Sequence, residues 1–592
     1  MKRVVTIVLC VLMLCPLLGC TARIPSAKEP TEQELFNLLF DIENKIELKL
    51  DMSEEELAKM QADYENYDLQ GSKSPIYRIG NLHVTITTPD NMVYTYTIEE
   101  VGVRMKGNTS RTDFYSEQEG IYNTIHLKLS FQETFDDAAY YGSDAKIWSD
   151  AWKEERKNRT FATLEKLDLR WNRCDDSTYL KEYFAYATYR QYGVLAPRTS
   201  LASFDWAGIH MGVFTINEPI DETFLARNLP QEALGGDLYK IGWAGNRNGS
   251  FTSTTSIGIE DEDSGKFYAY DLKTNKKTST HQSLTNLIKT LNQANVSKEE
   301  LAAVVDMDTF LPYCAVSYLL GNPDDLRNNY NNAYIYFRKD TGKAILIPYD
   351  YDRCLGITAH WNPTGDGVTS DNPFSLKQNA NNSNQESPLF RLTVTAGGFY
   401  VREYAQILEQ IASGDWFTYS NFSNLYQTAS AHYKNLTTPD KSFHNTKGLH
   451  LSFQLDRTSA FSSNSNISIS EYLCAKQATL KTYLTNVDYY AAYDPQTPSQ
   501  WYIRCDKTNW QNDPDYAMDS NGGTIMISIT VNDQIRLKVY NNATGSWYGS
   551  ECILDDCTVT FATDNHTNIV LGRGSYRITF DPVTETIILT YT

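Results

Sequence analysis

The chain has 592 residues and a formal net charge of −20, because 73 Asp and Glu residues outnumber 53 Lys and Arg residues. A chain of this length can bury a large core and is expected to hold two or more domains. The negative charge argues against a nucleic-acid partner, which would need a basic face. The sequence also has no Walker A motif, no G-x-S-x-G elbow and no two His residues at metal-ligand spacing.

The first 20 residues have the features of a bacterial lipoprotein signal peptide. Two basic residues precede an apolar run that ends at Leu18, and Leu17–Cys20 (LLGC) matches the lipobox. The run is shorter than the roughly 20 apolar residues of a membrane-spanning helix. We therefore expect cleavage before Cys20, lipidation of its sulfur, a polar tether over residues 21–34 and an extracytoplasmic protein anchored to a bacterial membrane.

Strand and helix patterns alternate from residue 35 to residue 490. The periodicity of apolar residues predicts strands over 45–50, 82–88, 93–98, 126–129, 167–172, 201–206, 210–217 and 237–240. It predicts helices from 54 onward and over 178–192, 308–320, 388–395, 401–411, 422–433 and 469–484. This mixture predicts an α+β fold.

A basic strand lies near the start of this region. In Val101–Ser110 (VGVRMKGNTS), apolar residues alternate with Arg104 and Lys106, and the segment then breaks at a turn that begins at Gly107. Basic side chains on one face, followed by a glycine turn, can contact phosphates through side chains and backbone N–H groups.

Acidic and amide residues crowd both ends of a predicted hairpin with strands over 333–337 and 344–348. They are Asp324, Asp325, Asn328, Asn329, Asn331 and Asn332 before the hairpin, and Asp350 and Asp352 after it. Antiparallel pairing places the start of the first strand beside the end of the second, so the two groups should meet. Their oxygens suit Mg²⁺ or Mn²⁺. The alternative is a solvated acidic loop.

These residues resemble the signature of the spore-coat protein H (CotH) kinase family. The resemblance lies in Asp325, in Asn332–Tyr336 (NAYIY), in Ile347–Asp352 (IPYDYD) with Gly356, and in Val101–Ser110. It implies an atypical protein-kinase-like catalytic domain, here over residues 35–490, that uses ATP and a divalent metal. The expected substrate is Ser or Thr of a surface or spore-coat protein.

The resemblance also implies roles for individual residues. Asp325 would accept or orient the substrate hydroxyl, and Asp350, Asp352 and Asn332 would hold the metal. The ATP-binding residues would be Arg104, Lys106, Lys128 and Lys240, with Glu218 as the acidic partner of Lys240 or Lys106, unless Glu218 forms only an exposed ion pair. Asp324 and Asn329 have the five-residue spacing of kinases, whereas Asp325 and Asn332 are seven apart, so this register stays open.

The composition and the predicted secondary structure change near residue 490. Pro495 and Pro498 indicate a linker over 491–500, and short strands at regular intervals predict an all-β sandwich over 501–592. Trp510, Trp547 and Tyr548 in this part resemble the aromatics of starch-binding-type modules, which implies a polysaccharide partner; aromatics of an ordinary core are the alternative.

Three functions of different classes follow. The first is a membrane-anchored, ATP- and metal-dependent Ser/Thr kinase. The second is a non-catalytic surface scaffold that binds glycan through the C-terminal domain. The third is a metal-dependent hydrolase that uses the same acidic residues.

Overall fold

A computed structural model describes residues 29–358, 369–375, 387–461, 466–485, 500–521, 524–550 and 559–591. The predicted lipidation site at Cys20, the signal peptide and the linker over 491–499 lie outside the described residues. Within the described ranges, no helix has the length and apolar character needed to cross a bilayer. Helices and strands are mixed along the chain, which confirms the α+β class; the likeness to a protein kinase stays a prediction.

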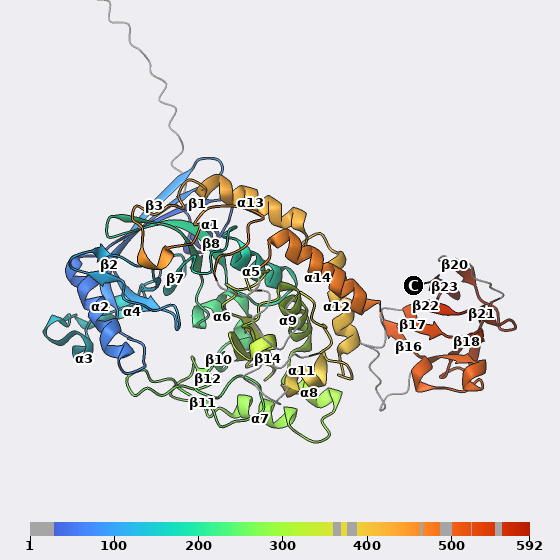
Figure 1. Ribbon diagram of the computed structural model, residues 1–592. Coiled ribbons are helices and arrows are strands. Elements are labelled where there is room, and N and C mark those ends of the chain that lie inside the picture. The colour runs from blue at the N-terminus through green and yellow to red at the C-terminus, as the bar shows by residue number, and fades with distance from the viewer. Residues whose placement is uncertain are drawn as a thin grey trace, which may run out of the picture.

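Seven strands close into a barrel in the N-terminal part, shown in blue to teal in Figure 1. Their order is β1-β2-β3-β6-β7-β9-β8, and parallel pairing of β1 with β8 completes the closure. Alternate residues fill the interior with Leu, Ile, Val and Phe. The strands are β1 (Lys45–Asp51), β2 (Arg78–Thr87), β3 (Val93–Lys106), β6 (His126–Ser130), β7 (Lys166–Trp171), β8 (Thr199–Trp206) and β9 (Ile209–Asn217).

Short helices surround the barrel. The helix α1 (Glu32–Leu39) begins inside the predicted tether, because Thr31 and Glu34 form a capping box there. The tether therefore ends earlier than residue 34. The helix α2 (Glu54–Asp68) starts after the N-cap Ser53, as predicted. Residues 132–160 contain α3 (Ala138–Tyr141), a 3₁₀ turn and α4 (Asp150–Lys157).

A second sheet has the order β11-β12-β10-β13-β14. Its strands are β10 (Leu238–Ile241), β11 (Ile257–Gly258), β12 (Tyr270–Leu272), β13 (Ala333–Phe337) and β14 (Ala344–Pro348). The hairpin β13–β14 has the predicted bounds, and all ten of its residues are buried. The short helices α6 (Glu222–Asn228) and α10 (Leu326–Asn329) also belong to this half, whereas the short strands β4 (Tyr115–Ser116) and β5 (Gly120–Ile121) belong to the barrel part.

Helices pack around this second sheet. They are α5 (Lys181–Gln191), α7 (Gln282–Leu291), α8 (Lys298–Val304), α9 (Met307–Leu320), α11 (Pro388–Thr393), α12 (Val401–Ser413), α13 (Tyr419–Tyr433) and α14 (Ile469–Leu484). The central helix α9 contacts α5, α12 and β14 and is buried on nearly all sides. Its N-cap is Asp306, so α9 begins one residue before the predicted start at 308.

The C-terminal part is all β, as predicted, and is drawn in orange-red to dark red in Figure 1. Its strands are β15 (Trp501–Cys505), β16 (Ala517–Asn521), β17 (Thr524–Val531), β18 (Ile535–Asn541), β19 (Ser546–Tyr548), β20 (Val559–Ala562), β21 (Ile569–Leu571), β22 (Gly574–Asp581) and β23 (Thr586–Tyr591). One apolar cluster fills the core. The strand β16 pairs with both β15 and β17, so the expected two sheets form one continuous run of neighbours.

Candidate active site between the barrel and the acidic hairpin

The two acidic ends of the hairpin meet, as the sequence predicts. Ala333 pairs with Pro348, which places Asn332 beside the segment that begins at Tyr349. Asn332 and Asp350 both have left-handed backbone angles, with φ of 52° and 61°. Asn and Asp tolerate this conformation better than other residues, and such strain gathers at functional sites.

Arg170 on β7 joins the acidic residues of this loop. Its Nη2 donates to Asp350 Oδ1 (2.5 Å) and to Asp352 Oδ2 (3.0 Å), and its Nη1 donates to Glu182 Oε1 (2.6 Å). The Arg170 side chain is only 9% exposed, whereas that of Asp350 is 33% exposed. A buried guanidinium therefore lies behind a carboxylate that solvent and ligands can reach.

Burial and neighbouring charges shift the pKa values of Asp350, Glu182 and Asp352 in different directions. Burial raises the pKa of Asp350, but the charge and hydrogen bond of Arg170 outweigh it and hold the pKa at about 2. Burial also raises the pKa of Glu182, to about 7, despite the opposing charge of Arg170. For Asp352, burial and the nearby charge of Asp350 raise the pKa.

Basic side chains lie on the neighbouring outer face of the barrel. Lys106 forms an ion pair with the buried Asp168, and Lys128 lies 3.7 Å from the same carboxylate. Burial raises the pKa of Asp168, but the two ammonium groups dominate and lower it to about 2. The alternation that buries Val101 and Val103 in the barrel leaves Lys106 on this outer face.

The side chain of Tyr349 connects the basic face to the acidic loop. Lys240 and Lys106 lie 4.7 Å and 5.5 Å from the centre of the Tyr349 ring. Burial raises the pKa of Tyr349, but the two ammonium groups outweigh this and lower it. Asp350 follows Tyr349 directly in the chain, so the lysines and the carboxylates border one site.

The donors present fit a hard divalent cation. Asp350 and Asp352 each place one carboxylate oxygen within 3.0 Å of the same nitrogen of Arg170, so the two carboxylates lie close together. Magnesium takes one or two carboxylates together with substrate phosphates. Asn332 uses its amide nitrogen, which donates to the carbonyl of Asp324 (3.0 Å). In the described ranges, no group of three or more His, Cys, Asp or Glu side chains has the geometry of a metal site.

Comparison with known proteins agrees with this arrangement. A family model described as CotH kinase protein matches residues 119–471, which is more than half of the chain. The chain belongs to the CotH kinase family. The matched range includes Lys128, Lys240 and the acidic hairpin, and it begins after Arg104 and Lys106.

One curated relative is the inner spore coat protein H of Bacillus subtilis (strain 168). It is 25% identical over 190 residues, which cover 31% of this chain and 49% of the relative. The CotH-family chain thus spans about half the length of this relative. Among solved structures, SusF from Bacteroides thetaiotaomicron is 18% identical with a TM-score of 0.13, over 17% of this chain and 24% of that one.

The structure does not support the role expected for Asp325. Its side chain is fully buried as the N-cap of α10. Oδ1 accepts from the backbone and side-chain amides of Asn328 (2.9 and 3.0 Å), and Oδ2 accepts from Ser317 (2.5 Å) and Tyr351 (3.1 Å). A carboxylate with both oxygens engaged inside the core cannot receive a substrate hydroxyl, so Asp325 holds the loop together.

Unlike Asp325, the neighbouring Asp324 can be reached by solvent. Its side chain is partly exposed, and its Oδ1 accepts from Asn329 (2.6 Å) and Asn331 (3.1 Å). Burial raises the pKa of Asp324 to about 6, although these two hydrogen bonds oppose the shift. The direct contact with Asn329 favours the five-residue register, which is the alternative that the sequence left open.

Two predicted ATP-binding residues make other contacts. Glu218 is buried and accepts from Arg227 (2.6 and 2.9 Å), so it pairs with neither Lys240 nor Lys106. The ion pair between Glu218 and Arg227 is buried, whereas an exposed ion pair was the expected alternative. The guanidinium of Arg104 donates to the carbonyl of Ser74 (3.0 Å) and lies over the ring of Tyr77.

Sequence reasoning missed Arg170, Asp168 and Glu182. The available signal was the strand Lys166–Trp171 (KLDLRW), in which Asp168 and Arg170 alternate with buried Leu residues. The acidic partner of Lys106 comes from this strand and not from Glu218.

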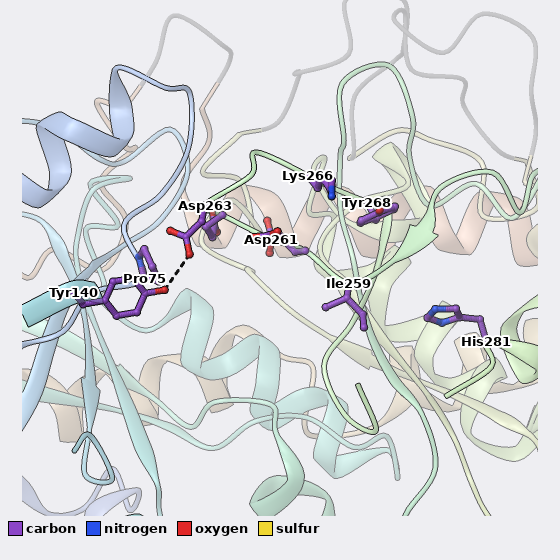
Figure 2. A pocket seen from close by; sticks show the side chains of 10 residues that line it. Pro75, Tyr140, Ile259, Asp261, Asp263, Lys266, Tyr268 and His281 are labelled. Carbon is purple, nitrogen blue, oxygen red and sulfur yellow. Dashed lines mark hydrogen bonds between the residues drawn. The ribbon is translucent and has the colours of Figure 1, made fainter. Parts of the chain in front are cut away.

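A cavity of about 640 Å³, drawn in Figure 2, is lined mainly by residues 259–268. Its wall includes Glu260, and burial raises the pKa of that carboxyl while the charges of Lys273, Lys73 and Lys240 lower it. Tyr140, which also lines the cavity, donates to Asp263 (3.0 Å), the contact that is dashed in Figure 2. Lys240 does not line the cavity, and neither do the other lysines of the candidate site.

The three aromatics expected to bind glycan divide between two environments. Trp510 and Trp547 are half-buried neighbours with ring centres 6.3 Å apart. Tyr548 instead packs on Phe580 in the core, with ring centres 4.6 Å apart, because successive residues of a strand face opposite sides. The glycan role of Tyr548 is therefore not supported.

Proposed function

We propose that this CotH-family chain is an ATP- and metal-dependent protein kinase that transfers the γ-phosphate of ATP to Ser or Thr of a surface or spore-coat protein. The observation that carries the proposal is the contact of Lys106 and Lys240 with Tyr349, which brings a basic face to the carboxylates of Asp350 and Asp352. Phosphoryl transfer needs these two kinds of group together.

Each residue has a role in the proposed reaction. Asp350 and Asp352 hold Mg²⁺ or Mn²⁺, which would neutralise charge on the phosphates. Lys106, Lys128 and Lys240 contact phosphate oxygens. Asp324 accepts the proton of the substrate hydroxyl, because its raised pKa of about 6 suits a general base near neutral pH.

The proposed location is the outside of a bacterial membrane. The lipobox at Leu17–Cys20 supports a lipid anchor on Cys20. The name of the Bacillus relative refers to the inner spore coat, which supports a surface or coat protein as the substrate.

Phosphotransfer from γ-labelled ATP tests the kinase proposal. Residues 21–592 are incubated with Mg²⁺ or Mn²⁺ and a Ser-rich acceptor, beside Asp350→Ala and Asp324→Asn. We expect label on the acceptor or on the protein itself, lost in both variants. Absence of both labelling and ATP binding in the wild-type protein would contradict the proposal and favour the scaffold, whereas cleavage of a substrate without transfer would favour the hydrolase.

A second activity, glycan binding, is favoured by the outer face of the C-terminal sheet. The guanidinium of Arg504 lies 3.4 Å from the ring centre of Tyr540, and that ring lies 4.7 Å from the ring of Trp547. Together with Trp510, these half-buried rings offer apolar surface with polar neighbours, which suits the faces of sugars.

Affinity electrophoresis in gels that contain a soluble α-glucan tests this activity. We expect retardation of the wild-type protein and of Asp350→Ala, and its loss in Trp547→Ala. Trp152→Ala is the matched control, since Trp152 is a solvent-exposed tryptophan (61%) that lies on α4 of the N-terminal part. Equal retardation of the wild-type protein and Trp547→Ala would exclude this surface.

A further inference from the structure

Arg170 makes the contacts that a residue organising a cation site would make. Its Nη2 lies within 3.0 Å of one oxygen from each of Asp350 and Asp352. We infer that Arg170 is a positioning residue that holds these two carboxylates in the arrangement that binds one divalent cation. The inference rests on the proposed function and adds a residue and a stoichiometry to it.

The contacts leave room for a cation beside Arg170. Nη2 uses Oδ1 of Asp350 and Oδ2 of Asp352, and no described residue donates a hydrogen bond to the second oxygen of Asp350. A cation can therefore bind through the second oxygen of Asp350 while Arg170 keeps its place. Ligating carboxylates in metal sites are themselves hydrogen-bonded in this way, which fixes their orientation.

The shared contact of Asp350 and Asp352 with one nitrogen of Arg170 favours a single cation beside them. Arg170 contacts three carboxylates, those of Glu182, Asp350 and Asp352, so the group carries an excess of two negative charges when all three are ionised. Lys106 is already paired with Asp168.

Arg170 is itself held from two sides. It belongs to β7, whose neighbours β6 and β9 fix it within the closed barrel. Glu182 on α5 accepts from its other nitrogen, and the hydroxyl of Tyr186 accepts from the backbone N–H of Asp350 (2.9 Å). The barrel, α5 and the acidic loop are thus joined at this guanidinium, which gives it the rigidity that positioning requires.

Binding of Mn²⁺ to the nucleotide-free protein, followed by electron paramagnetic resonance of the free ion, tests the inference without an activity assay. We expect Arg170→Gln to bind Mn²⁺ about 10- to 100-fold more weakly than the wild-type protein. Arg170→Lys should recover part of the loss, because it restores the charge but not the fork of donors. Arg227→Gln is the matched control, since it breaks another buried ion pair away from the site and should bind Mn²⁺ normally.

The outcomes separate this inference from the proposed function. If Arg170→Gln binds Mn²⁺ as tightly as the wild-type protein or more tightly, Arg170 competes with the cation and the inference is overturned while the metal site stands. If the wild-type protein binds no Mn²⁺ with or without ATP, the metal-dependent function fails and the inference with it. Should circular dichroism show that Arg170→Gln is unfolded, Arg170→Lys and Glu182→Gln decide: weaker binding in both supports the inference, and unchanged binding in both overturns it.

Discussion

Lys106 on β3 forms an ion pair with Asp168 on β7, and its ammonium group also lies 5.5 Å from the ring centre of Tyr349. The pair is almost buried, since the Lys106 and Asp168 side chains are 17% and 5% exposed. Asp168 thus fixes the ammonium group that we assign to the ATP phosphates.

Asp168→Asn should weaken ATP binding and destabilise the barrel. Removing one partner of a buried ion pair leaves the other charge uncompensated, which costs about 3–5 kcal/mol. Denaturant unfolding and calorimetric ATP titration measure the two effects. Glu218→Gln is the matched control: it breaks the buried pair with Arg227 and should lose stability while ATP affinity is kept. Loss of ATP binding in both variants would mean that the effect is only structural.

Asp324→Asn should lower phosphotransfer, whereas Asp325→Asn should lower the stability of the fold. Asp324→Asn should fold normally and lose phosphotransfer by a factor on the order of 10² or more, because a general base is removed. Asp325→Asn should lose about 1–3 kcal/mol of stability, because a carboxylate that accepts four hydrogen bonds in the core is replaced. Single-turnover labelling and urea unfolding of both variants separate the two roles; the reverse pattern would restore Asp325 as the base.

The rate of phosphotransfer should rise with pH through about 6. Asp324 has a pKa of about 6 and acts as a base only when it is deprotonated, so the rate is low below this pH and reaches a plateau above it. A pH–rate profile under single-turnover conditions, at saturating Mg²⁺, measures this. The residual activity of Asp324→Asn should lack the step, and a step of the same midpoint in that variant would assign the titration to another group.

Asp371→Asn should destabilise the helical half of the chain by about 3–5 kcal/mol. The Asp371 carboxylate accepts from Arg327 (3.0 Å) and from Lys476 (2.8 Å), and all three side chains are at most 4% exposed. The variant leaves two buried cations without their shared anion. Thermal unfolding measures the change, and Asp340→Asn, which breaks the solvent-accessible contact with Arg338, should leave the unfolding temperature unchanged.

Local sequence patterns predicted the parts of the fold that depend on near neighbours. The hairpin of β13 and β14 has the expected bounds because its alternation and turn lie within sixteen residues. Closure of the barrel depends on β1 pairing with β8, more than 140 residues away, and no local pattern encodes that distance. The same holds for the site, since Asp350 and Arg170 are separated by 180 residues.

The choice between Asp324 and Asp325 as the candidate base shows a second limit of prediction from the sequence. Both residues lie in the short loop between α9 and α10 and have the same chemistry, and only the start of α10 decides which one becomes a buried cap. A shift of one residue at a helix start is within the usual uncertainty of such boundaries. The pattern identified the loop correctly, whereas the three-dimensional structure was needed to choose between its two carboxylates.

The strand β7 carries both halves of the site on one face. Asp168 binds the lysines and Arg170, two residues later, binds the acidic loop, so the spacing between the two halves equals one strand repeat of roughly 6.6 Å. Deleting or inserting one residue ahead of Asp168 within this strand would turn both side chains toward the barrel interior. The two halves would then be lost together, and β7 should tolerate changes of side chain far better than changes of length.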